Sequence, residues 1–143
     1  MYKRAFHISF VLLPLLASAC GVLPSAKPVA PDTKALGITP GVDPSGTWLY
    51  EEGAQALLLK LDEHGNGEYP WKNGSFRTQS IHDYLWTGTW HQPGNNREGG
   101  FSIKMDADFV RGAGRWWYTR IGENKDPKRP GGEFSIERQP SIH

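Results

Sequence analysis

Residues 45–143 predict an all-β domain, which is expected to be a small antiparallel up-and-down barrel of about eight strands. Fourteen of their side chains are Trp, Tyr or Phe, residues that strands favour. Glycines recur at short intervals between the apolar stretches, as turns between short strands require. No segment carries an apolar stripe at helical spacing over three turns. A closed barrel leaves no free strand edge, and a two-sheet β-sandwich is the alternative architecture.

Four strands are expected in the first half of this domain, at residues 46–51, 54–61, 67–71 and 75–80. In the second of them, Leu57, Leu59 and Leu61 occupy alternate positions and therefore share one face. The Asn66-Gly67 pair suits the tight turn of a hairpin that leads into the third strand. The fourth strand is the weakest of the four and follows a second Asn-Gly pair.

Four more strands are expected in the second half, at residues 84–91, 99–105, 113–121 and 132–138. A long polar loop, ENKDPKRPG, separates the last two of them. Alternation predicts the residues that share one face, which are Tyr84, Trp86, Gly88 and Trp90 in the fifth strand and Phe101, Ile103 and Met105 in the sixth.

An internal repeat supports closure of the sheet. The triplet Gly46-Thr47-Trp48 recurs as Gly88-Thr89-Trp90. After each copy comes an apolar strand, and then two glycines and an aromatic residue, each separated from the next by one residue. Two three-strand meanders in tandem predict a sheet that curls and closes on itself.

The segment GRWWYTRIG, residues 114–122, places two tryptophans side by side. Neighbours in a strand point to opposite faces, so the two cannot both point inward. Alignment of the two repeats places Trp116 and Tyr118 inside and Trp117 outside, with Arg120 on the inward face. An exposed Trp suggests a contact surface, and an inward Arg needs a carboxylate or an acidic ligand.

Three residues resemble positions that are typical of lipocalins. The G-T-W opening, followed by a hairpin with G-x-G-x-Y, is similar to the start of avidins and lipocalins. In lipocalins, a Trp at this place closes one end of the barrel and is covered by an Arg from the last strand. Gly46, Trp48 and Arg138 match those positions. The resemblance implies a barrel architecture and no particular ligand.

The N-terminus has the three parts of a secretory signal, expected at residues 1–19. Lys3 and Arg4 are basic, residues 10–16 form an apolar run, and small residues follow. The apolar run is shorter than the ~18 residues that a transmembrane helix needs.

Ala17-Ser18-Ala19-Cys20 resembles the lipobox of bacterial lipoproteins, although Leu16 stands one position earlier than the favoured Leu of that class. The resemblance implies that Cys20 receives a diacylglycerol on its sulfur and becomes an acylated, palmitate-bearing N-terminus. Gly21, in place of an Asp, implies an outer-membrane location facing the periplasm in a Gram-negative host. The alternative is a soluble secreted protein with a lone thiol, which would be a liability in an oxidising compartment.

Residues 20–44 are expected to be a Pro-rich linker that spaces the folded domain, residues 45–143, from the membrane. They contain no sustained apolar periodicity. The whole chain holds 16 basic and 15 acidic side chains, so we expect no nucleic-acid partner.

No catalytic motif, cofactor motif or metal-ligand cluster stands out, so we expect a protein that is not an enzyme and uses no cofactor or metal. The first hypothesis is a barrel that binds a small, partly apolar ligand. The residues expected to contact this ligand are Trp86, Trp90, Trp116, Tyr118 and Arg120. The six tryptophans could instead fill so small a barrel completely.

The second hypothesis is a protein-interaction module, either an inhibitor or an envelope-assembly accessory. Its contact residues are expected to be Trp117 and, in the polar loop of residues 95–100, Arg97 and Glu98. Structural roles are also open for these side chains. Trp117 could lie under the loop of residues 122–130, and Arg120 could lie at the barrel rim or pair with Glu98 or Glu133.

Overall fold

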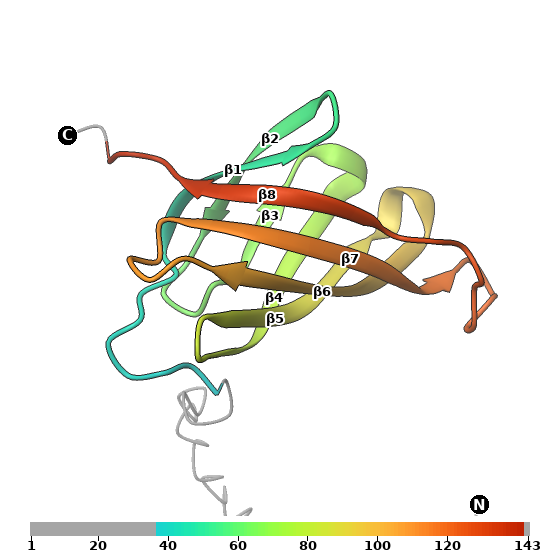
Figure 1. Ribbon diagram of the computed structural model, residues 1–143. Coiled ribbons are helices and arrows are strands. Elements are labelled where there is room, and N and C mark those ends of the chain that lie inside the picture. The colour runs from blue at the N-terminus through green and yellow to red at the C-terminus, as the bar shows by residue number, and fades with distance from the viewer. Residues whose placement is uncertain (1–36, 142–143) are drawn as a thin grey trace, which may run out of the picture. The chain divides into compact units, whose positions relative to one another are not determined.

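The computed structural model describes residues 37–141, in which eight antiparallel strands close into a barrel (Figure 1). The strands are β1 (Gly46–Glu52), β2 (Gln55–Leu61), β3 (Gly67–Tyr69), β4 (Gly74–His82), β5 (Leu85–Gln92), β6 (Arg97–Met105), β7 (Arg111–Ile121) and β8 (Gly132–Arg138). Two short 3₁₀ turns, η2 (Trp71–Asn73) and η3 (Pro93–Asn95), precede β4 and β6. Within this range, no helix has the length and apolar character needed to cross a membrane.

Each strand pairs with its neighbours in the chain, and β1 closes the barrel by pairing with β8. At this seam, Trp48 lies opposite Arg138. The predicted all-β, up-and-down barrel is therefore confirmed, and its strands lie close to the predicted ranges. The expected signal peptide, the lipidation at Cys20 and most of the expected linker lie outside the described residues.

The strand predictions are wrong in detail at three places. Residues 95–100 were expected to be a polar loop, but β6 already begins at Arg97. The third strand was expected to reach residue 71 but ends at Tyr69. Pro70 has a helical backbone and no N–H for a ladder, so the chain turns into η2 there. Tyr84 was expected to share the inward face of β5, but it lies in the β4–β5 turn with φ +63° and is 54% exposed.

One end of the barrel is closed by aromatic side chains. Trp48 and Trp86 are fully buried and meet edge to face, with ring centroids 5.5 Å apart. The Arg138 guanidinium lies 4.4 Å from the centre of the Trp48 ring and donates hydrogen bonds to the carbonyls of Ser45 and Asp43. A pair of such rings contributes ~0.5–1.5 kcal/mol beyond its buried area. The closing role that the lipocalin resemblance implies for Trp48 and Arg138 is present here.

Residues before β1 also pack against this closed end. The Trp48 indole N–H donates to the carbonyl of Pro44, a residue that is itself buried. Ile38 forms a bridge with Ile81 of β4, and Thr39 donates its backbone N–H to the Ile81 carbonyl. Residues 38–44, which were expected to belong to the linker, therefore cover the closed end of the barrel.

Glycines on the inner wall let aromatic rings lie close to the strands. A Cβ at Gly99 would lie 2.7 Å from the Trp90 ring, and one at Gly88 would collide with the Phe101 ring. A ring lying over a strand glycine covers backbone that would otherwise lack a side chain to pack against it. The rings therefore line the wall of the barrel and leave space in its open half.

Candidate ligand-binding pocket

The open end of the barrel holds a pocket of about 950 Å³. This volume lies at the upper end of the range typical of small-molecule sites, ~300–1,000 Å³. Aromatic side chains dominate its lining, which includes Tyr50, Tyr69, Trp71, Phe76, Trp90, Phe101, Trp116, Tyr118 and Phe134. A few polar side chains join them, namely Glu52, Gln55, Gln92, Asn95 and Arg97.

The floor of the pocket is a stacked pair of rings. Phe76 and Phe101 lie face to face, with ring centroids 4.1 Å apart. Beneath them, Phe76 meets Trp86 edge to face at 5.7 Å. The pocket therefore ends at this pair, above the Trp48 and Trp86 core.

The tryptophans do not fill the barrel, because they occupy four different environments. Trp48 and Trp86 are buried at the closed end, whereas Trp90 and Trp116 line the pocket. Trp71 is 55% exposed and lies in η2 at the mouth. Trp117 is on the outer face of β7. Only two of the six tryptophans therefore belong to the filled core.

A carboxylate is held on the β1 side of the pocket. The Tyr50 hydroxyl donates to one oxygen of Glu52 at 2.7 Å, and the Trp116 indole N–H donates to the other at 2.9 Å. Burial and the neighbouring Glu52 carboxylate raise the pKa of Tyr50 well above its ordinary value, so this phenol stays protonated. The arrangement fixes the Trp116 ring and the carboxylate together.

A second set of polar side chains on the pocket wall is joined by hydrogen bonds. The Asn95 amide donates to the Gln92 side-chain oxygen at 3.1 Å, and the Gln92 amide donates to the Tyr69 hydroxyl at 3.0 Å. Burial raises the pKa of Tyr69. This chain links the η3 turn at the mouth to β3.

Two arginines approach the same aromatic ring. The guanidinium carbon of Arg97 lies 5.8 Å from the centre of the Tyr118 ring, and that of Arg129 lies 6.0 Å from it. Arg97 also donates a long hydrogen bond, 3.4 Å, to the Tyr118 hydroxyl. Arg97 begins β6, whereas Arg129 belongs to the loop between β7 and β8, so two separate elements bring positive charge to this ring.

Two buried polar atoms in the described residues have no hydrogen-bond partner, and both belong to side chains that line this pocket. They are the Trp90 indole nitrogen and the Asn95 side-chain oxygen. An unpaired buried polar atom costs ~1–3 kcal/mol, so such atoms usually meet a water or a ligand. Here both atoms are buried within side chains that line the pocket.

Three of the five predicted ligand contacts line this pocket: Trp90, Trp116 and Tyr118. Their rings pack edge to face against one another, with centroids 5.0–5.6 Å apart. Trp86 does not line it. It is fully buried below the floor, and its indole N–H donates to the Thr78 hydroxyl at 2.8 Å.

The inward placement of Arg120 is wrong, because β7 contains a bulge. Gly99 pairs with Tyr118 while the adjacent Glu98 pairs with Arg120, which leaves an extra residue in β7 and reverses the alternation. Arg120 therefore shares a face with Glu98, and two of its three guanidinium nitrogens donate to the Glu98 carboxylate at 3.0 and 3.1 Å. One of the alternatives considered from the sequence, a pair with Glu98, is what the structure has.

The structure separates the three predicted protein-interaction residues. Arg97 lines the pocket, and Glu98 is engaged by Arg120. Trp117 points outward, as predicted, and is 41% exposed. A Cβ at Gly100 would collide with its ring, so packing over this glycine accounts for the position of the indole.

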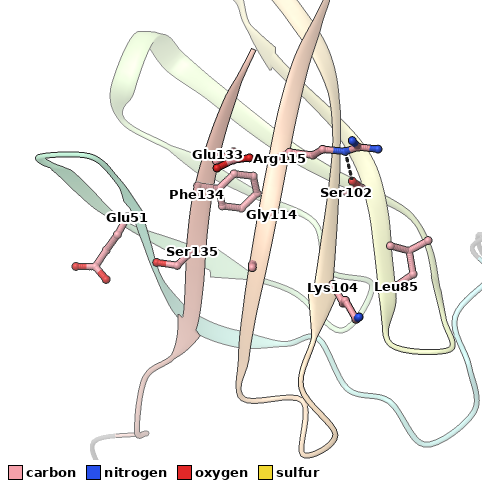
Figure 2. Close-up of a pocket in the computed structure, with 10 residues that line it drawn as sticks. Glu51, Leu85, Ser102, Lys104, Gly114, Arg115, Glu133, Phe134 and Ser135 are labelled. Carbon is pink, nitrogen blue, oxygen red and sulfur yellow. Dashed lines mark hydrogen bonds between the residues drawn. The ribbon is translucent and has the colours of Figure 1, made fainter. Parts of the chain in front are cut away.

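A shallow hollow lies on the outer face of the barrel, across β5 to β8 and the edge of β1 (Figure 2). Lys104 and Arg115 stand beside it on one side and Glu51 and Glu133 on the other, as Figure 2 shows. The Arg115 Nε donates a long bond, 3.4 Å, to the Ser102 hydroxyl. Its mixed charges and open shape make it a weaker candidate site than the aromatic pocket.

Several pocket residues were missed from the sequence, among them Tyr50, Glu52 and Gln92. Tyr50 and Glu52 continue the alternation that begins at Trp48, and Gln92 continues the one through Trp90. Extending each inward row by one or two alternate residues toward the mouth would have found them.

Comparison with protein-family models, with curated protein sequences and with solved structures gives no match. A functional assignment therefore depends on the pocket described above.

Proposed function

We propose that the barrel is a non-enzymatic binding module that holds one small, partly apolar molecule in its open-end pocket. The observation that carries this proposal is an aromatic-lined hollow of about 950 Å³ whose lining also includes a few polar side chains, among them Gln92, Asn95 and Arg97. Apolar surface favours burial of a ligand, and a few polar groups set its orientation.

Binding is favoured over catalysis by how the polar groups of the pocket are used. Both oxygens of Glu52 accept hydrogen bonds from fixed aromatic side chains, which suits a structural carboxylate. Gln92, Asn95 and Tyr69 are joined to one another in the same way. Among the pocket residues described here, no Ser, Thr or Cys nucleophile stands beside a base.

We also propose that the barrel works at a bacterial envelope, tethered through a lipid on Cys20. The support for this is the order of basic, apolar and small residues before the single cysteine. Radiolabelled palmitate should enter the wild-type chain and should not enter the Cys20→Ser variant. Equal labelling of both chains would contradict the anchor.

A fluorescence titration with N-phenyl-1-naphthylamine, a neutral aromatic probe that brightens in apolar surroundings, tests the binding proposal. We expect one probe to bind per chain. Leu57→Trp puts extra volume into the pocket. A steric cost of about 1–3 kcal/mol, the usual cost of overpacking, corresponds to a loss of affinity of about 5- to 150-fold.

Leu58→Trp is the matched control, because Leu58 is the next residue of β2 and is 55% exposed on the outer face. It should bind the probe as the wild type does. A wild-type chain that does not bind the probe, or equal binding by both variants, would overturn the proposal.

A further inference from the structure

We infer that the molecule bound in this pocket is an amphiphilic anion, with an apolar ring-containing body against the aromatic wall and an anionic group at the mouth. The anionic group, a carboxylate, sulfonate or phosphate, would lie between Arg97 and Arg129 beside Tyr118. This inference rests on the proposed binding function and adds the chemical class of the ligand.

Arg97 is a half-buried cation without a carboxylate partner among the described residues. Three of the seven arginines among residues 37–141 pair with a carboxylate: Arg77 with Glu68, Arg111 with Glu137, and Arg120 with Glu98. Arg97 instead has only the long contact with the Tyr118 hydroxyl and the face of its ring. A partly desolvated guanidinium gains most from an anion that accepts two of its N–H groups.

Arg129 brings a second guanidinium to the same place. Both guanidinium carbons lie within 6.0 Å of the centre of the Tyr118 ring, although they come from different elements. No carboxylate lies within 4 Å of Arg129 among residues 37–141. Of the two acidic residues in its loop, Asp126 pairs with Lys128, and Glu123 forms no ion pair with Arg129. Two guanidiniums that face one ring make its surroundings electropositive, and an anion bound beside the ring would be attracted to both of them.

Trp90 packs against the same ring, edge to face, with centroids 5.6 Å apart. Its indole nitrogen lacks an acceptor but is buried. The unpaired donors that a ligand could reach beside Tyr118 are therefore those of Arg97 and Arg129. A ligand that approaches here is selected for hydrogen-bond acceptors.

Glu52 is the one acidic side chain of the pocket lining, and its position favours an anion over a cation as ligand. Its carboxylate already accepts hydrogen bonds from Tyr50 and Trp116, which hold it in place and weaken its pull on a cation. The unpaired charges at the pocket are the guanidinium of Arg97 in its lining and that of Arg129 beside Tyr118. A cationic ligand would have to displace these contacts and face Arg97.

The test compares two probes that share one aromatic body, 8-anilinonaphthalene-1-sulfonate and N-phenyl-1-naphthylamine, which lacks the sulfonate. Both are titrated against the full chain and its Arg97→Met/Arg129→Met double variant. The double variant should weaken sulfonate-probe binding at least about tenfold, the value of one charge-assisted hydrogen bond, and change neutral-probe binding less than about twofold.

Arg115→Met is the control, because Arg115 is an exposed arginine on the outer face of β7. The affinity of neither probe should change in this variant. Glu52→Gln should strengthen sulfonate-probe binding, because it removes a like charge from the pocket lining. Thermal unfolding confirms that each variant is folded.

The outcomes separate the two proposals. If neither probe binds the wild type, the binding function itself fails, and the ligand class fails with it. If the neutral probe binds but the double variant does not weaken the sulfonate probe selectively, the ligand class alone is overturned. A loss of sulfonate-probe binding in Glu52→Gln that matches the loss in the double variant would also overturn it.

Discussion

At the level of single residues, the Glu98–Arg120 pair shows how one side chain on the outer face sets the local electrostatics. The hydrogen bonds from Arg120 hold the pKa of Glu98 below its ordinary value of 4.5, and the charges of Arg120 and His91 act in the same direction. The pair also anchors the bulged end of β7, because Arg120 donates further hydrogen bonds to the Asn96 side chain and to the Gly122 carbonyl.

This pair predicts a pH-dependent contribution to stability. The pKa of Glu98 is lowered by folding, so its contribution is present above the unfolded value near 4.5 and is lost as the pH falls through the folded value. The difference in unfolding free energy between wild type and Glu98→Gln should therefore shrink below about pH 4.5. Urea unfolding at a series of pH values measures it.

A double-mutant cycle separates the pair from the carboxylate alone. In an Arg120→Met background, the Glu98→Gln change should have little pH-dependent cost, because the hydrogen bonds that lower the pKa are gone. An undiminished pH dependence in that background would show that Arg120 is not its cause.

At the level of strands, alternation and glycine turns carried enough information to place all eight elements. The rows Leu57, Leu59, Leu61 and Phe101, Ile103, Met105 are inward in the structure as predicted. The alternation of residues along one strand does not reveal where an extra residue is inserted. The bulge between Tyr118 and Arg120 reverses the faces from that point on, and it depends on the partner strand β6 rather than on a local signal in β7.

The ring-over-glycine contacts of the inner wall give a prediction at the same scale. A Cβ at Gly99 would collide with the Trp117 carbonyl oxygen and lie 2.7 Å from the Trp90 ring. Gly99→Ala should therefore lower the free energy of unfolding by about 1–3 kcal/mol, the usual cost of overpacking. Chemical denaturation monitored by tryptophan fluorescence measures it.

Lys104→Ala is the control in the same strand, because Lys104 is exposed on the outer face. Its effect should stay within about 0.5 kcal/mol. If the two substitutions lower the free energy of unfolding equally, the close approach at Gly99 does not affect stability.

At the level of the whole molecule, the barrel divides into a filled half and an open half. Trp48, Trp86 and the Phe76–Phe101 pair fill one end, and Arg138 and residues 38–44 cover it. The other end keeps its aromatic side chains against the wall. The asymmetry gives a small barrel both a stable core and a hollow of about 950 Å³.

Alternation in the sequence predicted that Trp86, Trp90, Trp116 and Tyr118 point inward but not whether they leave a cavity. Free volume depends on where each ring lies along the barrel axis and on which glycine of a neighbouring strand it covers, as Trp90 does at Gly99. Alternation within one strand does not reveal those relations. Trp90, Trp116 and Tyr118 therefore line the pocket, whereas Trp86, two inward positions before Trp90 in β5, is in the core.

Native mass spectrometry of the chain purified without denaturation, from cells that produce it, tests the central claim most directly. We predict a population that carries one small molecule per chain, retained in Leu58→Trp and missing in Leu57→Trp. The bare protein mass for wild type and both variants, with no added molecule taken up from a mixture of small aromatic acids, would contradict the account.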